Sequence, residues 1–432
     1  MKPRVTLEPL RGFRDILAPE AEELTSLANT FRRMARLHGY REVIPPTLER
    51  FELFALKSGE EIRNSMYVFR DKAGREVALR PEATASIARI YLKHLRAEPK
   101  PLRLYYVVNC FRYEEPQHAR YREFFQAGVE LLGEPSPLGD VEVASLLYRF
   151  YERIGMGKHI EIIAGNTGLY RALFGRYGVP EELQDHVLHL MDKKEYEKAR
   201  EALREKSSEL ADIVARLWEI GDIDTEQRYR EARNLLESIE PRAAETLEHL
   251  RFFMERLREL GAKVRTDLSF ARGLAYYTGI IFEVKVPGFP VSVAGGGRYD
   301  TLISLYGGEE MPATGFAIGL DRTLLAAKET GIELSLGTDT GPRLAVVYLD
   351  PSLLGYALRV QELLVDWGFE AVLYAGKKLG RLLPRLAEQG FTHAVIIGGR
   401  EASEGRVSLR NLREKRQISV ELGRLPLLLS TF

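Results

Sequence analysis

A short polar segment near residue 115 carries the arginines best suited to chemistry in this sequence. Arg112, Arg120 and Arg122 flank it, and Glu114 and Glu115 lie within it. A guanidinium group presents a planar fork of N–H donors that can grip two phosphate oxygens at once. The pattern therefore predicts a site for a phosphate-bearing ligand.

The runs on either side of this segment predict an antiparallel hairpin. Residues 102–111 are aromatic and β-branched, and apolar residues alternate with others from 124 to 131. Because strand side chains alternate between faces, Gln126 and Glu130 project the same way, with Gly128 leaving a gap between them. An amide and a carboxylate over a gap suit a polar amino acid, although the solvent face of an amphipathic strand has the same pattern.

Several other chemical signatures are missing from the sequence. The nearest approach to a P-loop, at residues 155–159, lacks both the glycine spacing and the hydroxyl that would bind magnesium. The eight histidines include no His-Glu-x-x-His pair, and we expect His186 and His189 to be surface or core side chains. Cys110 is the single cysteine, which excludes an internal disulfide and a multi-thiolate metal site and fits a reducing compartment. The sequence therefore predicts no protein-bound metal centre.

The composition is that of a folded protein without a membrane segment. The chain has 432 residues, of which 45% are hydrophobic and 29% charged, and roughly 150 residues per domain predicts about three domains. Its 62 Lys and Arg balance 62 Asp and Glu, which argues against general coating of nucleic acids. No run reaches the ~18 apolar residues of a membrane helix, and the first 15 residues carry charges. We therefore expect a cytoplasmic protein that is neither exported nor membrane-spanning.

Changes in periodicity predict one large domain over residues 1–334. It begins with a helix over about 19–38, whose apolar residues recur at helical spacing, and it is rich in strands from 66 to 132. A charge-rich, strongly helical block at about 180–260 then separates these strands from later ones. Strands that give way to helices and then resume are typical of a helical insertion in an antiparallel-sheet domain.

The C-terminal part of the chain has a different pattern. A turn-rich linker at 335–342 precedes alternating strands and helices over 343–432, which predicts a compact α/β module with a largely parallel sheet. Residues 377–416 contain ten Lys and Arg against four Glu, a local surplus of six positive charges. Such a surplus could bind RNA phosphates, although a solvated basic face has the same composition.

Five strings of residues occur in the order in which one known family has them. They are Leu79 to Ala85, Phe111 to Phe124, Arg272 to Gly279, Gly295 to Asp300 and Gly315 to Arg322. Together they resemble the signature motifs of the class II aminoacyl-tRNA synthetases, and specifically of the histidyl-tRNA synthetase family. The likeness extends from residue 11 through the C-terminal module. It implies an α+β catalytic domain built on an antiparallel sheet, with a helical insertion, and a C-terminal α/β anticodon-binding domain.

The resemblance also implies a reaction. A member of this family activates L-histidine with ATP and Mg²⁺ to histidyl-adenylate, and then transfers the histidyl group to the 3′-terminal ribose of tRNA-His. The carboxylate of the amino acid attacks the α-phosphate itself, so alignment and charge stabilisation must supply most of the rate. The family's first motif, matched at about residues 39–49, implies a homodimer.

Carried over position by position, the resemblance assigns a role to each matching residue. Arg112 and Arg272 would act as catalytic groups on opposite sides of the α-phosphate. The ATP site would comprise Arg112, Glu114, Arg120 and Arg322. The histidine site would comprise Glu82, Thr84 and Gln126 at the ammonium end and Glu130, Tyr276, Tyr277 and Tyr299 around the imidazole. A buried carboxylate and phenol that pair with ring nitrogens would reject analogues lacking them by roughly 10⁴-fold.

Each string also has an ordinary structural explanation. Pro81 and Glu82 suit the start of any helix, and Tyr276 and Tyr277 could simply pack a core. The glycines at 295–297 could form a bulge or a turn. These three strings occur together with the arginine-rich hairpin, and this combination favours a ligand-binding site.

Three positions depart from the family's usual pattern, and they keep a second hypothesis open. Ala275 stands where the family commonly has Asp, Asp321 where it has Glu, and Ala83 where glycine is frequent. The regulatory subunit of ATP phosphoribosyltransferase, a non-catalytic relative, often has Asp in the third motif. The retained arginines and the C-terminal module argue against that subunit. The tyrosine pair and the Gly-Gly-Gly-Arg-Tyr-Asp string argue against a synthetase for proline, threonine or glycine.

Overall fold

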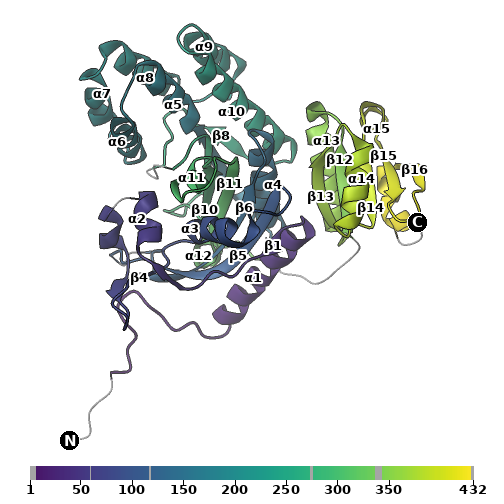
Figure 1. The fold of residues 1–432 in the computed structure, drawn as a ribbon, viewed down its shortest axis with the longest axis horizontal. Helices are drawn as coiled ribbons and strands as arrows, with labels where there is room; N and C mark the ends of the chain where they lie inside the picture. The colour runs from purple at the N-terminus through teal and green to yellow at the C-terminus, as the bar shows by residue number, and fades with distance from the viewer. Residues whose placement is uncertain (1–5, 59, 116–117, 273–275, 336–342, 430–432) are drawn as a thin grey trace, which may run out of the picture.

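A computed structural model describes residues 6–58, 60–115, 118–272, 276–335 and 343–429. Its largest element is an eight-stranded sheet, with order β1-β5-β6-β11-β10-β9-β7-β8 (Figure 1). In that order the strands are Arg41–Glu42, Leu102–Phe111, Glu123–Leu132, Ala313–Gly319, Ala294–Arg298, Ile280–Lys285, Glu161–Asn166 and Val264–Thr266. The six central strands pair antiparallel, as the sequence predicts, whereas the edge strands β1 and β8 pair parallel.

Long helices cover one face of this sheet and form the main core. They are α1 (Glu20–Leu37), α4 (Leu138–Arg153), α10 (Pro241–Glu259) and α12 (Leu320–Thr330). The predicted first helix is therefore confirmed, and its apolar stripe buries Phe31, whose ring meets Tyr105, Phe150 and Phe316 edge to face at 5.6–6.3 Å. The helix ends at Gly39, whose positive φ of 82° suits glycine.

A smaller layer covers part of the opposite face. Its three-stranded sheet has order β2-β4-β3, and the prolines that follow β1 separate that strand from β2, so residues 40–49 form two strands and not one. The elements of this layer are β2 (Leu48–Arg50), α2 (Glu52–Ser58), η1 (Glu60–Ser65), β3 (Val68–Arg70), β4 (Glu76–Leu79), α3 (Thr84–Ile90), η2 (Tyr91–Leu95) and α11 (Leu302–Leu305).

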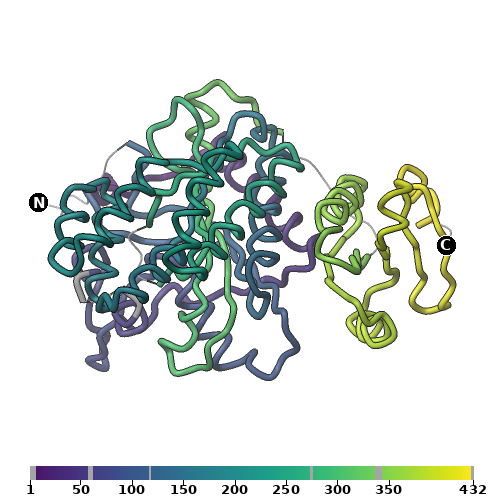
Figure 2. Tube along the Cα trace, turned by 90° about the horizontal axis from the view of Figure 1, so that it is seen from above, coloured from purple at the N-terminus to yellow at the C-terminus, as the bar shows by residue number. Residues whose placement is uncertain are grey.

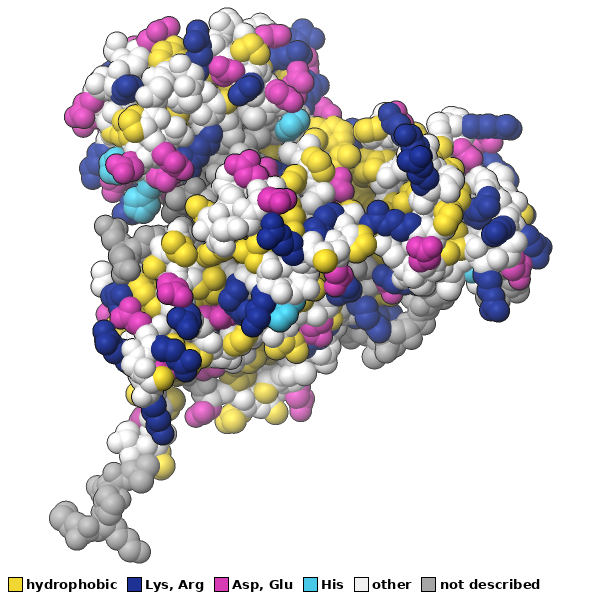
Figure 3. Space-filling view, in the orientation of Figure 1, with side chains coloured by type: hydrophobic (Ala, Val, Ile, Leu, Met, Phe, Trp, Pro, Cys, Tyr) yellow, Lys and Arg dark blue, Asp and Glu magenta, His cyan; other side chains and the backbone are white. Residues whose placement is uncertain are grey.

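A helical layer, the insertion, occupies the chain between β7 and β8. Its helices before α10 are α5 (Thr167–Arg176), α6 (Glu181–Asp192), α7 (Tyr196–Arg204), α8 (Ser208–Ile220) and α9 (Glu226–Glu237). Their apolar faces pack on one another, while exposed faces carry ion pairs such as Arg230–Glu226 at 2.7 Å. In the space-filling view the insertion forms an upper lobe, set off from the body by a notch (Figure 3).

The C-terminal module has its own five-stranded sheet, with order β13-β12-β14-β15-β16. The strands are β12 (Arg343–Tyr348), β13 (Glu370–Ala375), β14 (His393–Ile397), β15 (Arg406–Asn411) and β16 (Gln417–Glu421), and the longer helices are α13 (Leu354–Asp366) and α14 (Leu379–Glu388). The first three strands in chain order are parallel, as predicted, but β15 and β16 add an antiparallel edge. The module lies beside the large domain in both ribbon and tube views (Figures 1 and 2).

Buried ionic contacts join this module to the large domain. His38 lies 3.2 Å from Glu362 of α13, and Arg149 of α4 lies 3.4 Å from the same carboxylate. Burial alone would lower the pKa of His38, but the Glu362 carboxylate outweighs it and raises the pKa. Arg103 of β5 pairs with Glu142 at 2.8 Å and donates to the carbonyl of Leu373. None of the helices in the described part of the chain is long and apolar enough to cross a membrane.

Arg298 is predicted to be essential for the stability of the large domain. Its guanidinium pairs with the fully buried Asp140 at 3.0 Å and with Asp300 at 2.9 Å. Arg298→Met should therefore lower the free energy of unfolding by about 3–5 kcal/mol, because Asp140 would be left as an unpaired buried charge. Urea unfolding followed by circular dichroism measures the change. The exposed pair at Arg230 supplies the control, where Arg230→Met should change stability by less than about 1 kcal/mol; equal effects of the two variants would contradict the prediction.

Candidate active site

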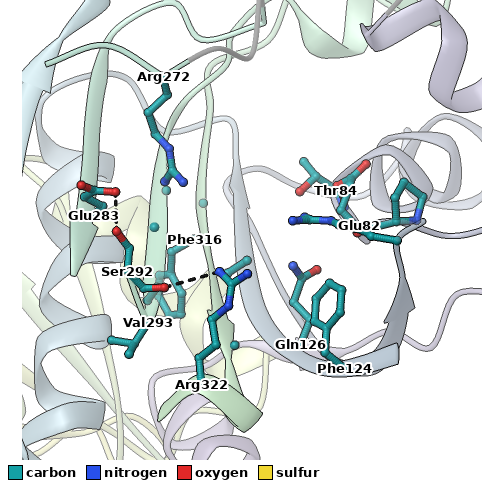
Figure 4. Close-up of a pocket in the computed structure, with 18 of the residues that line it drawn as sticks. Glu82, Thr84, Phe124, Gln126, Arg272, Glu283, Ser292, Val293, Phe316 and Arg322 are labelled. Carbon is teal, nitrogen blue, oxygen red and sulfur yellow. Dashed lines mark hydrogen bonds between the residues drawn. The ribbon is translucent and has the colours of Figure 1, made fainter. Parts of the chain in front are cut away.

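One cavity of about 750 Å³ lies between the large sheet, the three-stranded layer and the insertion. Every site residue predicted from the sequence lines it, although these residues come from elements far apart in the chain. They are Glu82, Thr84, Arg112, Glu114, Arg120, Gln126, Glu130, Arg272, Tyr276, Tyr277, Tyr299 and Arg322. Figure 4 shows Arg272 and Arg322 reaching toward each other across one side of the cavity, with Glu82, Thr84 and Gln126 on the other.

The arginine side of the cavity concentrates positive charge. Arg322 donates from Nε to the carbonyl of Ala119 at 3.0 Å, and Arg112 donates from Nε to the carbonyl of Pro81 at 3.1 Å. Burial, together with the like charges of Arg112, Arg120 and Arg272, lowers the pKa of Arg322 to about 10. Cations held this close repel one another, and a polyanion bound among them would relieve that repulsion.

The guanidinium of Arg272 lies against the floor of the cavity, where the strand beneath it has a glycine. A Cβ atom at Gly295 would overlap Nη1 of Arg272. Nη1 also donates a hydrogen bond to the carbonyl of Phe282 at 3.4 Å. The negative charge of Glu283 is among the influences that raise the pKa of Arg272 against the effect of burial. Gly295 therefore leaves the space that this guanidinium occupies, and it does so within a strand and not in a turn. The departure at Ala275 lies outside the described residues.

The opposite end of the floor holds a buried carboxylate against phenols. Tyr299 donates its hydroxyl to Glu130, and both side chains are buried. The ring of Tyr276 lies 4.7 Å from that of Tyr277 and 6.0 Å from that of Tyr299. A Cβ atom at Gly315 would overlap the carboxylate of Glu130, so the glycine of β11 makes room for it. Aromatic walls around one carboxylate suit a flat ring with an N–H donor.

One local prediction about this floor is wrong. Gly128 does lie between Gln126 and Glu130, but a Cβ there would overlap the hydroxyl of Tyr106. The gap is therefore filled by the fully buried Tyr106 of β5, which pairs with Gly128 in the sheet. Sequence reasoning missed Tyr106 because its register opposite Gly128 depends on the hairpin pairing.

Glu82 combines a structural role with its place in the cavity. Its carboxylate accepts hydrogen bonds from the backbone N–H of Thr84 at 2.6 Å and of Ala85 at 3.2 Å, at the start of α3. The helix-start explanation is therefore correct, and it fixes the carboxylate in the cavity wall. Gln126 lies beside it on the floor, with Oε1 3.5 Å from the thiol of Cys110.

Asp321, the second departure, holds the hairpin to α12. Its buried carboxylate accepts from the backbone N–H of Phe125 at 2.5 Å and pairs with Arg14 at 2.8 Å. Burial raises the pKa of Asp321, while these donors act in the opposite direction. The shorter aspartate thus reaches its partners and fixes the hairpin strand beside Arg322.

The cavity also contains residues for which the sequence gave no signal. His189 and Asp192 reach its wall from α6, one turn apart on the same helix face. His189 is an exposed side chain, as the sequence predicts, and the structure adds that it lines the cavity. Glu283 of β9 accepts a hydrogen bond from Ser292 at 2.6 Å and lies 3.0 Å from Lys285. Burial would raise the pKa of Glu283, but Ser292, Lys285 and Arg272 outweigh it and lower the pKa.

No cluster of three His, Cys, Asp or Glu side chains that could hold a metal ion occurs within the described ranges. The carboxylates that line the cavity are Glu82, Glu114, Glu130, Asp192, Glu283 and Asp321. Mg²⁺ usually retains several waters and is held by one or two carboxylates together with substrate phosphates. The cavity therefore suits a magnesium ion shared with a polyphosphate better than an all-protein metal site.

Comparison with known proteins points to one family. Residues 12–323 match the model described as histidyl-tRNA synthetase, and residues 343–430 match an anticodon-binding domain. The chain is 44% identical to the histidine–tRNA ligase of Metallosphaera sedula over 98% of each protein. It is also similar in fold to a crystal structure of histidyl-tRNA synthetase from Nostoc sp. PCC 7120, with a TM-score of 0.63, 24% identity and 99% coverage of both chains.

A further similar structure bears on the regulatory hypothesis. It is titled an ATP phosphoribosyltransferase regulatory subunit/histidyl-tRNA synthetase from Bacillus halodurans, with a TM-score of 0.65 and 24% identity. It covers 91% of this chain and 99% of its own. At that identity the likeness shows the fold alone. The histidine–tRNA ligases, with higher identity, therefore favour a synthetase over a regulatory subunit.

Cys110 should be unreactive in the folded protein. Burial raises the pKa of its thiol to about 12, so almost none of it is thiolate near pH 8. An aromatic disulfide reagent should therefore react at least about 100-fold more slowly with the folded chain than with chain unfolded in guanidinium chloride. Absorbance of the released thiol measures both rates. Rapid stoichiometric reaction of the folded protein would show that Cys110 contacts solvent.

Proposed function

The chain belongs to the histidyl-tRNA synthetase family, and we propose that its cavity forms histidyl-adenylate from histidine and ATP. As a histidine–tRNA ligase it then transfers the histidyl group to the 3′-terminal ribose of tRNA-His, with release of AMP. The observation that carries the proposed site is the charge pattern of one cavity. Its arginine side suits a triphosphate, and its Glu130 end suits a ring with N–H groups.

The arginines would supply most of the catalysis. The carboxylate of histidine attacks the α-phosphate, the bond to the β-phosphate breaks, and pyrophosphate leaves. Arg112 and Arg272 would stabilise the charge that builds up on the α-phosphate oxygens, and Arg322 and Arg120 would hold the distal phosphates. Because these cations are held in place before the substrate arrives, little reorganisation is needed during the reaction.

Histidine would bind with its ring at the Glu130 end. The carboxylate of Glu130 and the hydroxyl of Tyr299 would pair with the imidazole nitrogens, while Tyr276 and Tyr277 would enclose the ring. Glu82, Thr84 and Gln126 would bind the ammonium end, which directs the substrate carboxylate toward the arginines. An amino acid without ring N–H groups would leave Glu130 unpaired, and this cost supports selectivity.

Magnesium fits the cavity as part of the bound nucleotide. Glu114 and Glu283 are the carboxylates that would hold it together with the phosphates, since Glu283 has a lowered pKa and is ionised at neutral pH. Bound there, the ion would neutralise part of the phosphate charge.

The remaining expectations concern the rest of the assembly. We propose residues 1–334 as the catalytic domain with its insertion, 335–342 as a linker and 343–432 as the anticodon-binding domain, in line with the two matched models. Exposed Lys377, Lys378, Arg381 and Arg385 support RNA binding by this domain, and Lys and Arg side chains gather over it in Figure 3. A homodimer formed through the region around residues 39–49, located in the cytoplasm, completes the proposal.

Histidine-dependent exchange of labelled pyrophosphate into ATP tests the proposed activity. Exchange should require both histidine and Mg²⁺, and proline, threonine or glycine should not replace histidine. Absence of exchange, combined with tight binding to a phosphoribosyltransferase, would support the regulatory hypothesis instead.

Glu130→Gln tests the ring-binding end. Loss of one charged hydrogen-bond acceptor typically costs about 1.5–3 kcal/mol, so the KM for histidine in pyrophosphate exchange should rise about 10- to 100-fold. The KM for ATP should change less than about threefold, because the arginine side is untouched. Glu161→Gln, on β7 of the same sheet and outside the cavity, is the matched control. An unchanged KM for histidine in Glu130→Gln would remove Glu130 from the ring site.

A further inference from the structure

The segment of the chain before α1 lies against the hairpin that carries Arg120. The backbone N–H of Arg122 donates to the carbonyl of Gly12 at 2.8 Å, and Nη1 of Arg122 donates to the carbonyl of Arg11 at 3.4 Å. A Cβ atom at Gly12 would overlap the side chain of Arg122, so the absence of a side chain allows this close approach. The two segments are therefore in direct contact through backbone and side-chain atoms.

Arg14 joins this segment to three other parts of the fold. Its guanidinium pairs with the buried carboxylate of Asp321 at 2.8 Å, in the first turn of α12. It also pairs with Glu20 of α1 and lies over the ring of Tyr121, 4.2 Å from the ring centroid. A planar guanidinium has several donors and a flat face, so it can pair with carboxylates and stack on a ring at once. Tyr121 of the hairpin is thereby linked to α12 through Arg14.

Tyr121 carries this contact to the edge of the cavity. Tyr121 and Arg120 both line the cavity, whereas Arg14 lies outside it. On the other side of Arg120 in the chain, the carbonyl of Ala119 accepts from Nε of Arg322 at 3.0 Å. Arg120 is the residue between these two contacts. Its backbone is therefore fixed on one side by Arg322 and on the other, through Tyr121, by Arg14.

The two oxygens of the Asp321 carboxylate have different partners. Oδ1 pairs with Arg14, and Oδ2 accepts from the backbone N–H of Phe125 at 2.5 Å. Loss of the Arg14 guanidinium would keep the bond to Phe125, so strand β6 would stay in place. Tyr121 would lose its contact, and Asp321 would lose its guanidinium partner. The first of these losses falls on the residue next to Arg120, and the second falls on stability.

We propose that Arg14 is a positioning residue for Arg120, through which the segment before α1 fixes the hairpin on the ATP side of the cavity. The inference rests on the proposed role of Arg120 and Arg322 in holding the distal phosphates of ATP. Arg14 acts through Tyr121 and Asp321 and does not itself contact the nucleotide. A segment outside the cavity thus contributes to ATP binding by fixing a cation before the ligand arrives.

Arg14→Met tests the proposal in histidine-dependent pyrophosphate exchange, at a temperature below the thermal midpoint of every variant. The KM for ATP should rise about tenfold, because Arg120 would no longer be held in place before ATP binds. The KM for histidine should change less than about twofold, since the Glu130 end of the cavity is untouched. Arg11→Met is the matched control. Arg11 forms an exposed ion pair with Glu115 in the same segment, so both KM values should stay within about twofold of wild type.

Asp321→Asn in the Arg14→Met background separates positioning from stability. Arg14→Met alone should lower the thermal midpoint, because Asp321 would be a buried charge without its guanidinium partner. The asparagine removes that charge and can still accept from the N–H of Phe125. The midpoint should therefore recover by at least half, while the KM for ATP stays raised at least about fivefold. Because this double variant has no unpaired charge, it also carries the test if Arg14→Met does not fold.

Two results would overturn the proposal. A return of the KM for ATP to the wild-type value in the double variant would show that Arg14 serves only to neutralise Asp321. An unchanged KM for ATP in Arg14→Met, or equal rises in the KM values for ATP and histidine, would show that Arg14 does not act on the ATP side. A wild-type chain without histidine-dependent exchange would refute the proposed function instead, and that result is distinct from all of these.

Discussion

Mutual repulsion among guanidinium groups is the constraint on which this structure depends. Four arginines face one cavity, and burial, together with the like charges of the other three, lowers the pKa of Arg322 to about 10. Such an arrangement persists only if other contacts fix each cation. Backbone carbonyls hold Arg112, Arg272 and Arg322, and the Glu114 carboxylate pairs with Arg120. The site is therefore preorganised for a polyanion before any ligand binds, which is the condition for electrostatic catalysis.

The glycine-rich strands of the floor follow from the same constraint. Side chains that converge on one point must lie against the backbone beneath them, and Gly295 and Gly315 provide that space for Arg272 and Glu130. Such strands have few side chains to pack, and packing elsewhere must stabilise them. Arg298 does so at the end of β10, where it points away from the cavity and pairs with the buried Asp140. Strand β10 thus lines the site at Gly295 and is fixed to the core by the ion pair of Arg298.

Features of the fold and the site that depend on local sequence could be predicted. Features that depend on strand pairing or on packing between distant segments could not. The first helix, the antiparallel hairpin and the parallel part of the C-terminal sheet follow from local periodicity, and the arginines could be identified because whole strings of residues matched a family. Tyr106 could not, because its place depends on pairing with Gly128 across the hairpin. His189 and Asp192 could not either, since their helix has ordinary amphipathic spacing. Only the packing of the insertion over the cavity makes them part of it.

The hairpin that carries Arg112 and Arg120 also connects the two folded parts of the chain. Strand β5 begins beside Arg103, which pairs with Glu142 and donates to the carbonyl of Leu373 in the C-terminal module. It ends one residue before Arg112, in the cavity. A strand is stiff along its length, because each residue is fixed by hydrogen bonds to its neighbours. One paired strand therefore runs from the contact with the C-terminal module at Arg103 to the cavity at Arg112.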